Sequence, residues 1–147
     1  MMRRIPARLP AIGSSVAGVD AARCRSQLDA DPFATSLGVR LVEAGDDRLV
    51  LEMAVTEAHL NFMGVTHGGA VFGLADVALA LATNSERTAV AVDAHIVYSG
   101  GSRADDVLRV EVVGAAGGRR LATHRATVTR GDGRVVALFT GTVYNRD

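Results

Sequence analysis

The sequence predicts an α+β fold in which an antiparallel β-sheet wraps around one central, buried α-helix. Residues 68–82 are apolar on every side of a helix except at Asp76, which is typical of a buried helix, and we expect this helix to run from about residue 68 to residue 84. Six further segments have the length and alternation of β-strands, and glycine-rich turns separate several of them. A single open sheet would leave much of this helix exposed. The sheet must therefore wrap it, and a second copy of the chain is the simplest cover for the remainder.

One further helix is predicted before the sheet. Residues 19–31 have apolar side chains at helix-compatible spacing. Asp31-Pro32 should end this helix, because a residue that precedes proline disfavours the helical conformation. Phe33 and Leu37 follow, and we expect both side chains to contact the core.

Two of the predicted strands precede the central helix in the sequence, and four follow it. They are expected over residues 39–44, 49–55, 89–98, 106–113, 121–130 and 135–144. Residues 57–66 form a loop long enough to carry a function. Gly117-Gly118 and residues 131–133 should form hairpin turns, so we expect the last four strands to make an antiparallel meander. Alternation over residues 89–98 places Val92, Ala94, Ile96 and Tyr98 on one face, and Ala91, Asp93, His95 and Val97 on the other.

The overall composition argues against several classes of partner. The chain has 16 basic and 16 acidic residues, so its zero net charge favours neither nucleic acid nor a membrane as main partner. No apolar run reaches the roughly 18 residues needed to span a bilayer. The one cysteine, Cys24, cannot form an internal disulfide, which fits a reducing cytoplasm, and no base adjoins it to activate the thiol.

The first 18 residues differ in composition from the rest. They carry three arginines, two prolines and no acid. We expect a disordered extension over residues 1–18 rather than a targeting signal, followed by a single domain over residues 19–147.

Asp76 is the clearest sign of function in the sequence. A lone carboxylate on a buried helix costs several kcal/mol unless it is paired or hydrogen-bonded, so proteins seldom keep one without a use. Just upstream, Asn61 and His67 flank a loop whose glycines would let a ligand approach the backbone. The polar loop, the helix N-terminus and the buried acid together predict an active site.

These residues also form a longer pattern. The run Asn61-x2-Gly64-x2-His67-Gly68-Gly69-x2-Phe72-x-Leu74-Ala75-Asp76 closely resembles the signature of PaaI-type acyl-CoA thioesterases of the hotdog fold. The resemblance covers roughly residues 31–145 and includes Asn84-Ser85 at the end of the helix. It implies an antiparallel sheet wrapped around a helix, dimers that often pair into homotetramers, and hydrolysis of acyl-CoA thioesters.

The resemblance also implies roles for four residues, each with a structural alternative. Asp76 is implied as the nucleophile or general base, and the Gly68 N–H as the donor to the thioester oxygen. His67 and Asn61 are implied to shape and polarise the site. Alternatively, Asp76 caps a neighbouring segment, Gly68 serves packing, His67 fixes the loop by a hydrogen bond, and Asn61 forms an Asx-type turn.

Further residues are expected to bind substrate. Arginine suits phosphate groups, of which coenzyme A carries several, so Arg119 and Arg120 are predicted contacts, although a solvated turn is an equal alternative. The remaining predicted contacts are Gly69, Asp93, Tyr98 and Gly118. Relatives in the family carry a hydroxyl at the position of Ala91, and that role is not transferred. We expect no cofactor and no metal, since His59, His95 and His124 lack the spacing of metal ligands.

Helix geometry predicts that two chains share each site. Gly68 and Asp76 are eight residues apart, or about 12 Å along one helix, which is too far for both to act on one carbonyl group. Antiparallel helices related by a twofold axis would place Gly68 of one chain near Asp76 of the other. The main hypothesis is thus a dimeric thioesterase for aryl or medium-chain acyl-CoA. A hotdog hydratase or dehydratase, and a non-catalytic acyl-CoA-binding module, are the alternatives.

Overall fold

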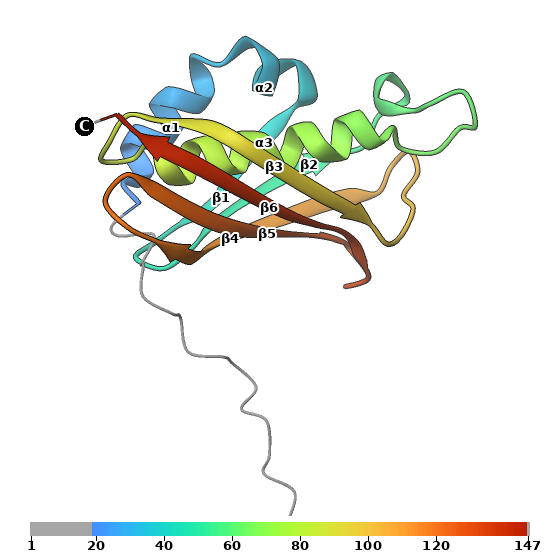
Figure 1. Cartoon of the computed structure of the whole chain (residues 1–147). Coiled ribbons are helices and arrows are strands. Elements are labelled where there is room, and N and C mark those ends of the chain that lie inside the picture. Colours follow the sequence, from blue (N-terminus) through green and yellow to red (C-terminus); the bar gives the residue numbers. More distant parts are fainter. Residues whose placement is uncertain (1–18, 147) are drawn as a thin grey trace, which may run out of the picture.

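The structure, a computed structural model, describes residues 19–146, so the extension predicted over residues 1–18 lies outside the described residues. A six-stranded antiparallel sheet curves around the long helix α3, Gly68–Thr83 (Figure 1). The strands are β1 Val39–Ala44, β2 Leu49–Ala54, β3 Ala89–Tyr98, β4 Val107–Gly117, β5 Leu121–Arg130 and β6 Val135–Asn145. The predicted α+β fold, with an antiparallel sheet around a central helix, is confirmed.

Helix α3 lies between the sheet and two short helices, α1 Ala21–Asp29 and α2 Pro32–Leu37. Most of its side chains are buried against β2, β4 and β5, as the apolar run predicted. Gly73 allows α2 to pack closely, because a Cβ at this position would lie 2.9 Å from the Phe33 ring. The apolar helix thus supplies the centre of the core.

Helix α2 was not predicted. The pair Asp31-Pro32 ends α1 as expected, but it also begins the next helix. The Asp31 carboxylate accepts a hydrogen bond from the Ala34 N–H at 3.0 Å, and proline occupies the first turn, where it is well tolerated. Leu37 is buried as predicted, whereas Phe33 contacts the core at Gly73 but leaves 53% of its surface exposed.

The predicted meander of four strands is wrong for β3. The sheet order is β1-β2-β4-β5-β6-β3, so only β4, β5 and β6 form a meander, and β3 pairs with β6 at the edge. Glycine turns specify the two hairpins of the meander, but no hairpin joins β3 to β4. The chain crosses over between them, which closes the sheet around α3.

A bulge in β3 changes which side chains face the helix. Ala91 pairs with Val143 and Asp93 with Thr142, so Val92 is an extra residue without its own partner. Cross-strand partners point to the same face of a sheet. Ala91 therefore shares the inner face with Ala94, Ile96 and Tyr98, contrary to the simple alternation, while Asp93, His95 and Val97 face outward.

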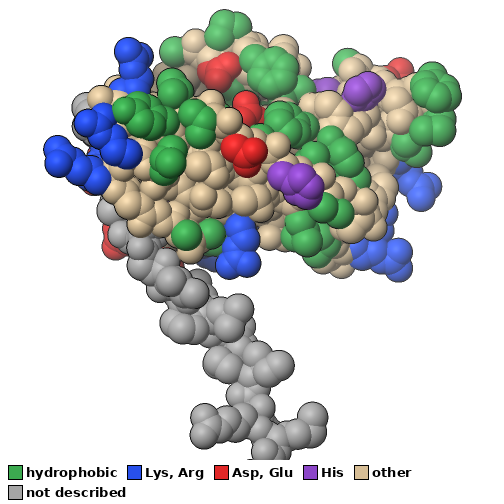
Figure 2. Space-filling model, viewed as in Figure 1, with side chains coloured by type: hydrophobic (Ala, Val, Ile, Leu, Met, Phe, Trp, Pro, Cys, Tyr) green, Lys and Arg blue, Asp and Glu red, His purple; other side chains and the backbone are tan. Residues whose placement is uncertain are grey.

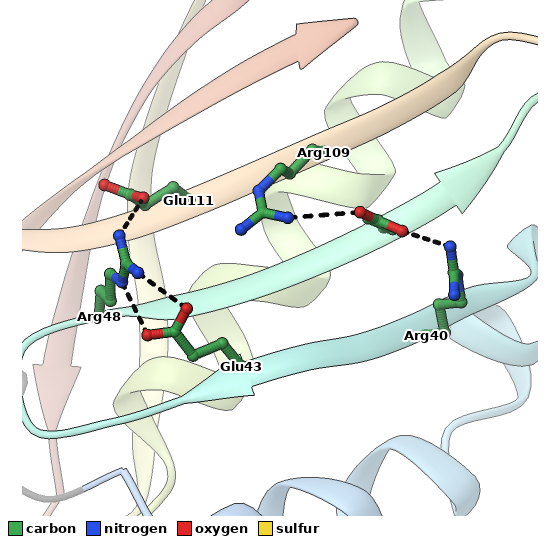
Figure 3. A network of polar contacts seen from close by, with 6 residues as sticks. Arg40, Glu43, Arg48, Arg109 and Glu111 are labelled. Atoms are coloured by element: carbon green, nitrogen blue, oxygen red, sulfur yellow. Dashed lines mark hydrogen bonds and ion pairs between the residues drawn. The ribbon is translucent and has the colours of Figure 1, made fainter. Parts of the chain in front are cut away.

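The outer face of β1, β2 and β4 carries paired charges (Figure 3). Glu52 lies between Arg40 and Arg109, and both arginines donate to its carboxylate. Arg48 contacts Glu43 at 2.8 Å and Glu111 at 3.1 Å. Each exposed pair adds at most about 1 kcal/mol to stability, but together they leave no unpaired charge among these six side chains.

No helix in the described part of the chain is long and apolar enough to cross a membrane.

Candidate active site

One face of α3 is left uncovered by the other residues that the structure describes. Gly69, Phe72, Asp76, Ala80 and Thr83 are partly or fully exposed and recur at intervals of three or four residues, so they form a single stripe. We call these five residues the exposed stripe of α3. Asp76 is its only charged member and lies at its centre.

The Asp76 carboxylate is half-buried and lacks a hydrogen-bond donor among residues 19–146. Burial raises the pKa of Asp76 above its ordinary value of 3.8, and the negative charge of Asp31 raises it further. A buried charge without a partner is costly to the fold. The predicted alternative, in which Asp76 caps a neighbouring segment, finds no such contact in this part of the chain.

Asp31 was not predicted to influence the site. It is the cap of α2, which lies across α3, and its charge acts on Asp76. The capping pattern Asp31-Pro32 is visible in the sequence and could have identified the start of a helix. The contact between α2 and α3 has no signal in the sequence.

The first turn of α3 leaves one backbone N–H without an acceptor among the described residues. His67 is the N-cap, and its Nδ1 atom accepts a hydrogen bond from the Gly69 N–H at 2.8 Å. The Ala70 N–H donates to the His67 carbonyl oxygen at 2.9 Å. Among the described residues the Gly68 N–H has no acceptor. Unpaired N–H groups at a helix N-terminus attract negative charge, so Gly68 could bind an oxyanion.

The structure gives His67 a defined tautomer. Because Nδ1 accepts a hydrogen bond, the proton of the neutral ring must lie on Nε2. The ring is thus held as a helix cap, which is the structural alternative to a direct chemical role. The two roles remain compatible, since Nε2 is left to donate toward solvent or substrate.

Asn61 shapes the loop before α3. Its Oδ1 atom accepts hydrogen bonds from the Met63 N–H at 2.9 Å and the Val65 N–H at 3.3 Å, which is the Asx-type turn weighed for this residue. The turn holds Phe62 at the tip with 98% of its surface exposed. The Asn61 oxygen is thereby occupied, and only its Nδ2 group is free to donate.

Tyr98 joins the end of β3 to the start of α3. Its hydroxyl group donates to the Gly68 carbonyl oxygen at 2.9 Å, and a Cβ at Gly68 would lie 3.1 Å from the Tyr98 ring. Glycine at position 68 therefore allows this close approach. The hydroxyl group of Tyr98, which was predicted to contact substrate, is thus hydrogen-bonded within the protein.

Several predicted site residues lie far from Gly68 within one chain. Arg119 and Arg120 follow Gly118 in the turn between β4 and β5, near the start of β3, because Tyr144 pairs with both Leu121 and Val90. Gly68 lies at the other end of β3, beside Tyr98. The eight steps along the strand from Val90 to Tyr98 span about 26 Å. One chain therefore does not bring the arginines and Gly68 together.

The remaining predicted contact, Asp93, is separated from Asp76 by the sheet. Its partner Thr142 points outward, where its hydroxyl group meets that of Thr123 at 2.9 Å. Asp93 is thus on the face opposite α3, as its alternation with Ala94 and Ile96 in the sequence already indicated.

The two arginines of the turn have different surroundings. Arg120 donates to the Tyr144 hydroxyl group at 2.8 Å, and its guanidinium lies 5.9 Å from the centre of that ring. Arg119 is exposed, and only its backbone carbonyl has a partner, the side-chain amide of Asn145. Arg119 therefore has the freer side chain for an anionic ligand.

Other reactive groups have structural surroundings. Cys24 is buried, and burial raises the pKa of its thiol, which is the opposite of activation. His124 lies in the core, where burial lowers its pKa and its Nδ1 atom has no partner. His59 accepts a hydrogen bond from the Thr56 N–H at 3.0 Å. Over residues 19–146 no three His, Cys, Asp or Glu side chains are grouped to hold a metal.

Comparisons with known proteins agree with this architecture. Residues 63–137 match the family described as Thioesterase superfamily. A presumed esterase of Deinococcus radiodurans is 39% identical over 120 residues, which cover 81% of this chain and 82% of that protein. The acyl-coenzyme A thioesterase PaaI of Escherichia coli is 31% identical over 112 residues, covering 76% and 80% of the two chains.

Solved structures give the same result. The structure of the E. coli PaaI protein, from the phenylacetic acid degradation operon, superposes with a TM-score of 0.84 and covers 90% of this chain and 97% of its own. A hypothetical thioesterase of Streptococcus pneumoniae, crystallised with coenzyme A, has a TM-score of 0.71 at 27% identity and covers 74% and 88%.

The chain belongs to the thioesterase superfamily, whose hotdog fold it shows. Within this superfamily it falls in the PaaI-type family, which confirms the resemblance drawn from the sequence.

Proposed function

We propose that this protein hydrolyses acyl-CoA thioesters at sites shared between two copies of the chain. The observation that carries the proposal is Asp76, a half-buried carboxylate without a hydrogen-bond donor in the described chain, on the exposed stripe of α3. The active sites of enzymes commonly hold such groups at a cost to stability. Membership of the thioesterase superfamily supplies the reaction class.

The edge strand β3 supports a dimer. Among residues 19–146 it pairs only with β6, so its other edge is unpaired over a strand of ten residues. Val90, Val92, Val97 and Tyr98 are exposed along it, and Figure 2 shows apolar side chains gathered on the side of the molecule that carries β3. A long, apolar, unpaired edge favours pairing with another strand. A second copy related by a twofold axis would pair its own β3 in the antiparallel direction.

Such pairing would assemble the dispersed site residues. In an antiparallel β3–β3 pair, the start of one strand lies beside the end of the other. The Arg119–Arg120 turn of one chain would then lie at the end of the dimer where the other chain has Gly68. The exposed stripes of the two α3 helices would face each other, with Gly68 opposite Asp76 of the partner subunit. Two such dimers would associate into a tetramer, as the family resemblance implies.

The proposed chemistry follows from this pairing. The Gly68 N–H binds the thioester oxygen and stabilises the negative charge that develops there, aided by the helix dipole. Asp76 of the partner subunit either attacks the carbonyl carbon or removes a proton from an attacking water molecule. In both routes the tetrahedral intermediate collapses and expels the CoA thiolate. Direct attack leaves a mixed anhydride between the acyl group and Asp76, which water then hydrolyses to the free acid, whereas general base catalysis releases the acid directly. Trapping of the anhydride by hydroxylamine would separate the two routes, and label in the Asp76 carboxylate after a single turnover in ¹⁸O-labelled water would show that water attacks the Asp76 carbonyl carbon of that anhydride.

Aromatic side chains near Asp76 favour an aryl or medium-chain acyl group. Phe72 lies one turn before Asp76 on the exposed stripe and packs edge-on against Phe139, with the ring centres 5.4 Å apart. Phe33 contacts Gly73 on the same helix while remaining half exposed. The two exposed rings could flank an apolar acyl group. Arg119, with its free guanidinium, would meet the phosphates of CoA.

The test is release of free thiol from a panel of acyl-CoA thioesters. Wild type should hydrolyse aryl or medium-chain members, and Asp76→Asn should lose at least about a hundredfold in turnover while still binding CoA. Glu43→Gln, a carboxylate exposed on the outer face of β1, is the matched control and should stay within a few-fold of wild type. Binding of CoA without turnover of any thioester would indicate the acyl-CoA-binding module instead, and hydration of an enoyl-CoA would indicate the hydratase.

A further inference from the structure

The peptide group between Gly68 and Gly69 is held at both ends by side chains. The Tyr98 hydroxyl group donates to its carbonyl oxygen at 2.9 Å. The His67 Nδ1 atom accepts from its N–H at 2.8 Å. A peptide group is planar, so one hydrogen bond at each end fixes the orientation of the whole plane.

These two hydrogen bonds restrain a segment whose backbone is otherwise little restrained. Gly68 and Gly69 lack side chains, and glycine has wider backbone freedom than any other residue. A Cβ at position 68 would lie 3.1 Å from the Tyr98 ring, so any larger residue would push the ring away by a few tenths of an ångström. The same lack of a side chain that admits the Tyr98 ring therefore leaves the first turn of α3 in need of an external restraint.

The donor proposed for the thioester oxygen lies on the other side of the same Cα atom. The Gly68 N–H belongs to the preceding peptide group, which receives no hydrogen bond from Tyr98. An effect of Tyr98 on the donor must therefore be geometric, through the backbone angles at Gly68. A small misplacement of such a donor matters, because an oxyanion site works only when its donors are already in position.

Tyr98 is itself firmly placed. It pairs with Ala137 of β6, and the next residue, Ser99, donates its N–H to the Val136 carbonyl oxygen at 2.9 Å. After the following turn, the buried Ser102 hydroxyl group meets Thr66 Oγ1 at 2.6 Å. The end of β3 is thus bound to the segment just before α3 at two separate points.

We propose that Tyr98 is a positioning residue for the oxyanion donor: its hydroxyl group fixes the Gly68–Gly69 peptide group and thereby the direction of the Gly68 N–H. The inference rests on the proposed thioesterase function. It replaces the predicted role of Tyr98 as a substrate contact. Because β3 is also the edge strand, the same side chain links the proposed subunit interface to the geometry of the donor.

The test is Tyr98→Phe, which keeps the ring against Gly68 and removes only the hydroxyl group. The kcat should fall about tenfold while KM stays within twofold, since the donor acts mainly on the transition state. Tyr144→Phe is the matched comparison, because its hydroxyl group is bonded to Arg120 in the proposed CoA site. Tyr144→Phe should raise KM and leave kcat nearly unchanged, which is the opposite of the result expected for Tyr98→Phe.

A second measurement is independent of activity. Amide hydrogen exchange at Gly69, followed by NMR, should accelerate several-fold in Tyr98→Phe and remain unchanged at Val77 in the middle of α3. Faster exchange with an unaltered kcat would overturn the proposal, as would a change confined to KM, which would return Tyr98 to substrate binding. If wild type hydrolyses no thioester, the proposed function fails, whereas unaltered exchange at Gly69 shows that the restraint itself is absent.

Discussion

The edge strand β1 is six residues long and packs against α1 and α2, whereas the edge strand β3 is ten residues long and mostly exposed. Glutamates and arginines lie over β1 and its neighbours and pair with one another (Figure 3). β3 instead exposes valines and a tyrosine, with Asp93 and His95 on its outer face. Short, covered or charged edges are the usual protection against pairing with other chains. β1 is short, covered and charged, whereas β3 is long, is not covered by the described residues and carries a single carboxylate.

The polar groups of α3 differ in the same way. Asn84, at the covered end of the helix, donates to the Ala80 carbonyl oxygen at 2.9 Å and accepts from the Ala89 N–H at 2.9 Å. Asp76, on the exposed stripe, has no such partner among the described residues. The side-chain amide of Asn84 is thus satisfied within the described chain, whereas the Asp76 carboxylate is not. Like that carboxylate, the free edge of β3 and the Gly68 N–H lack partners among the described residues, and the proposed dimer and reaction use all three.

The largest expected effect contrasts the two edges. Val92 in β3 and Val42 in β1 are both the extra residue of a bulge and are 58% and 42% exposed. Val92→Arg should break the dimer by placing a charge at the apolar interface, and should reduce activity at least about a hundredfold because the shared sites are lost. Val42→Arg should leave mass and activity unchanged. Light scattering after gel filtration measures the mass of each variant, and thiol release measures its activity.

Equal mass and activity of these two variants would contradict the proposed difference between the edge strands β1 and β3. If Val92→Arg stays dimeric and active, β3 is not the interface.

A smaller effect is expected at His67. His67→Ala removes the acceptor of the Gly69 N–H and should lower kcat about tenfold. His67→Asn should retain most activity, because asparagine is a favoured N-cap whose oxygen can accept the same hydrogen bond. Steady-state kinetics on the best acyl-CoA measure both. Equal losses in the two variants would assign His67 a chemical role through Nε2 rather than a capping role.

Stability should change in opposite directions when Asp76, in α3, and Asn84, the C-cap of α3, are each replaced. Asn84→Ala should lower the free energy of unfolding by about 2 kcal/mol, because it leaves buried backbone groups without partners. Asp76→Asn should raise it by on the order of 1 kcal/mol at pH 7, as a costly site charge is removed. Urea unfolding at one fixed protein concentration measures both, since dimerisation contributes to apparent stability. A loss in both variants would mean that Asp76 is a structural residue.

The gain from Asp76→Asn should depend on pH. The pKa of Asp76 is raised in the folded state, so the folded chain binds this proton more tightly than the unfolded chain. The stability cost of the charge is therefore fully present above the folded pKa and disappears as pH falls below the unfolded value of 3.8. The difference between variant and wild type should shrink over that range, and a constant difference would exclude the charge as its cause.

Local patterns predicted much of this fold. The apolar run gave α3 to within one residue at its end, and the Gly117-Gly118 turn gave the β4–β5 hairpin. The place of β3 was missed because hairpin signals act only between adjacent strands, and the β3–β6 pairing is not local. The bulge at Val92 was missed because an extra residue looks the same as regular alternation in the sequence.

The site was predictable in composition but not in geometry. Asp76 and the His67-Gly68-Gly69 run are distinguished by their apolar surroundings and by the family pattern. The hydrogen bond from Tyr98 to Gly68 joins residues 30 positions apart, and no pattern indicates it. The influence of Asp31 on Asp76 depends in the same way on how α2 packs across α3.

The most direct test of the shared site is complementation between two inactive variants, Asp76→Ala and Gly68→Pro. Proline suits position 68, because it is the first residue of α3 and the backbone of His67, at φ −62° and ψ 133°, is compatible with a following proline. The two variants are refolded together with an affinity tag on only one of them, so that co-purification of the untagged chain shows that hybrids form. In a hybrid dimer one site carries both changes and the other carries neither. With random pairing, half of the dimers are hybrids, so about a quarter of wild-type activity should return. Hybrids that form but remain inactive would place Gly68 and Asp76 of one site in a single chain and contradict the account.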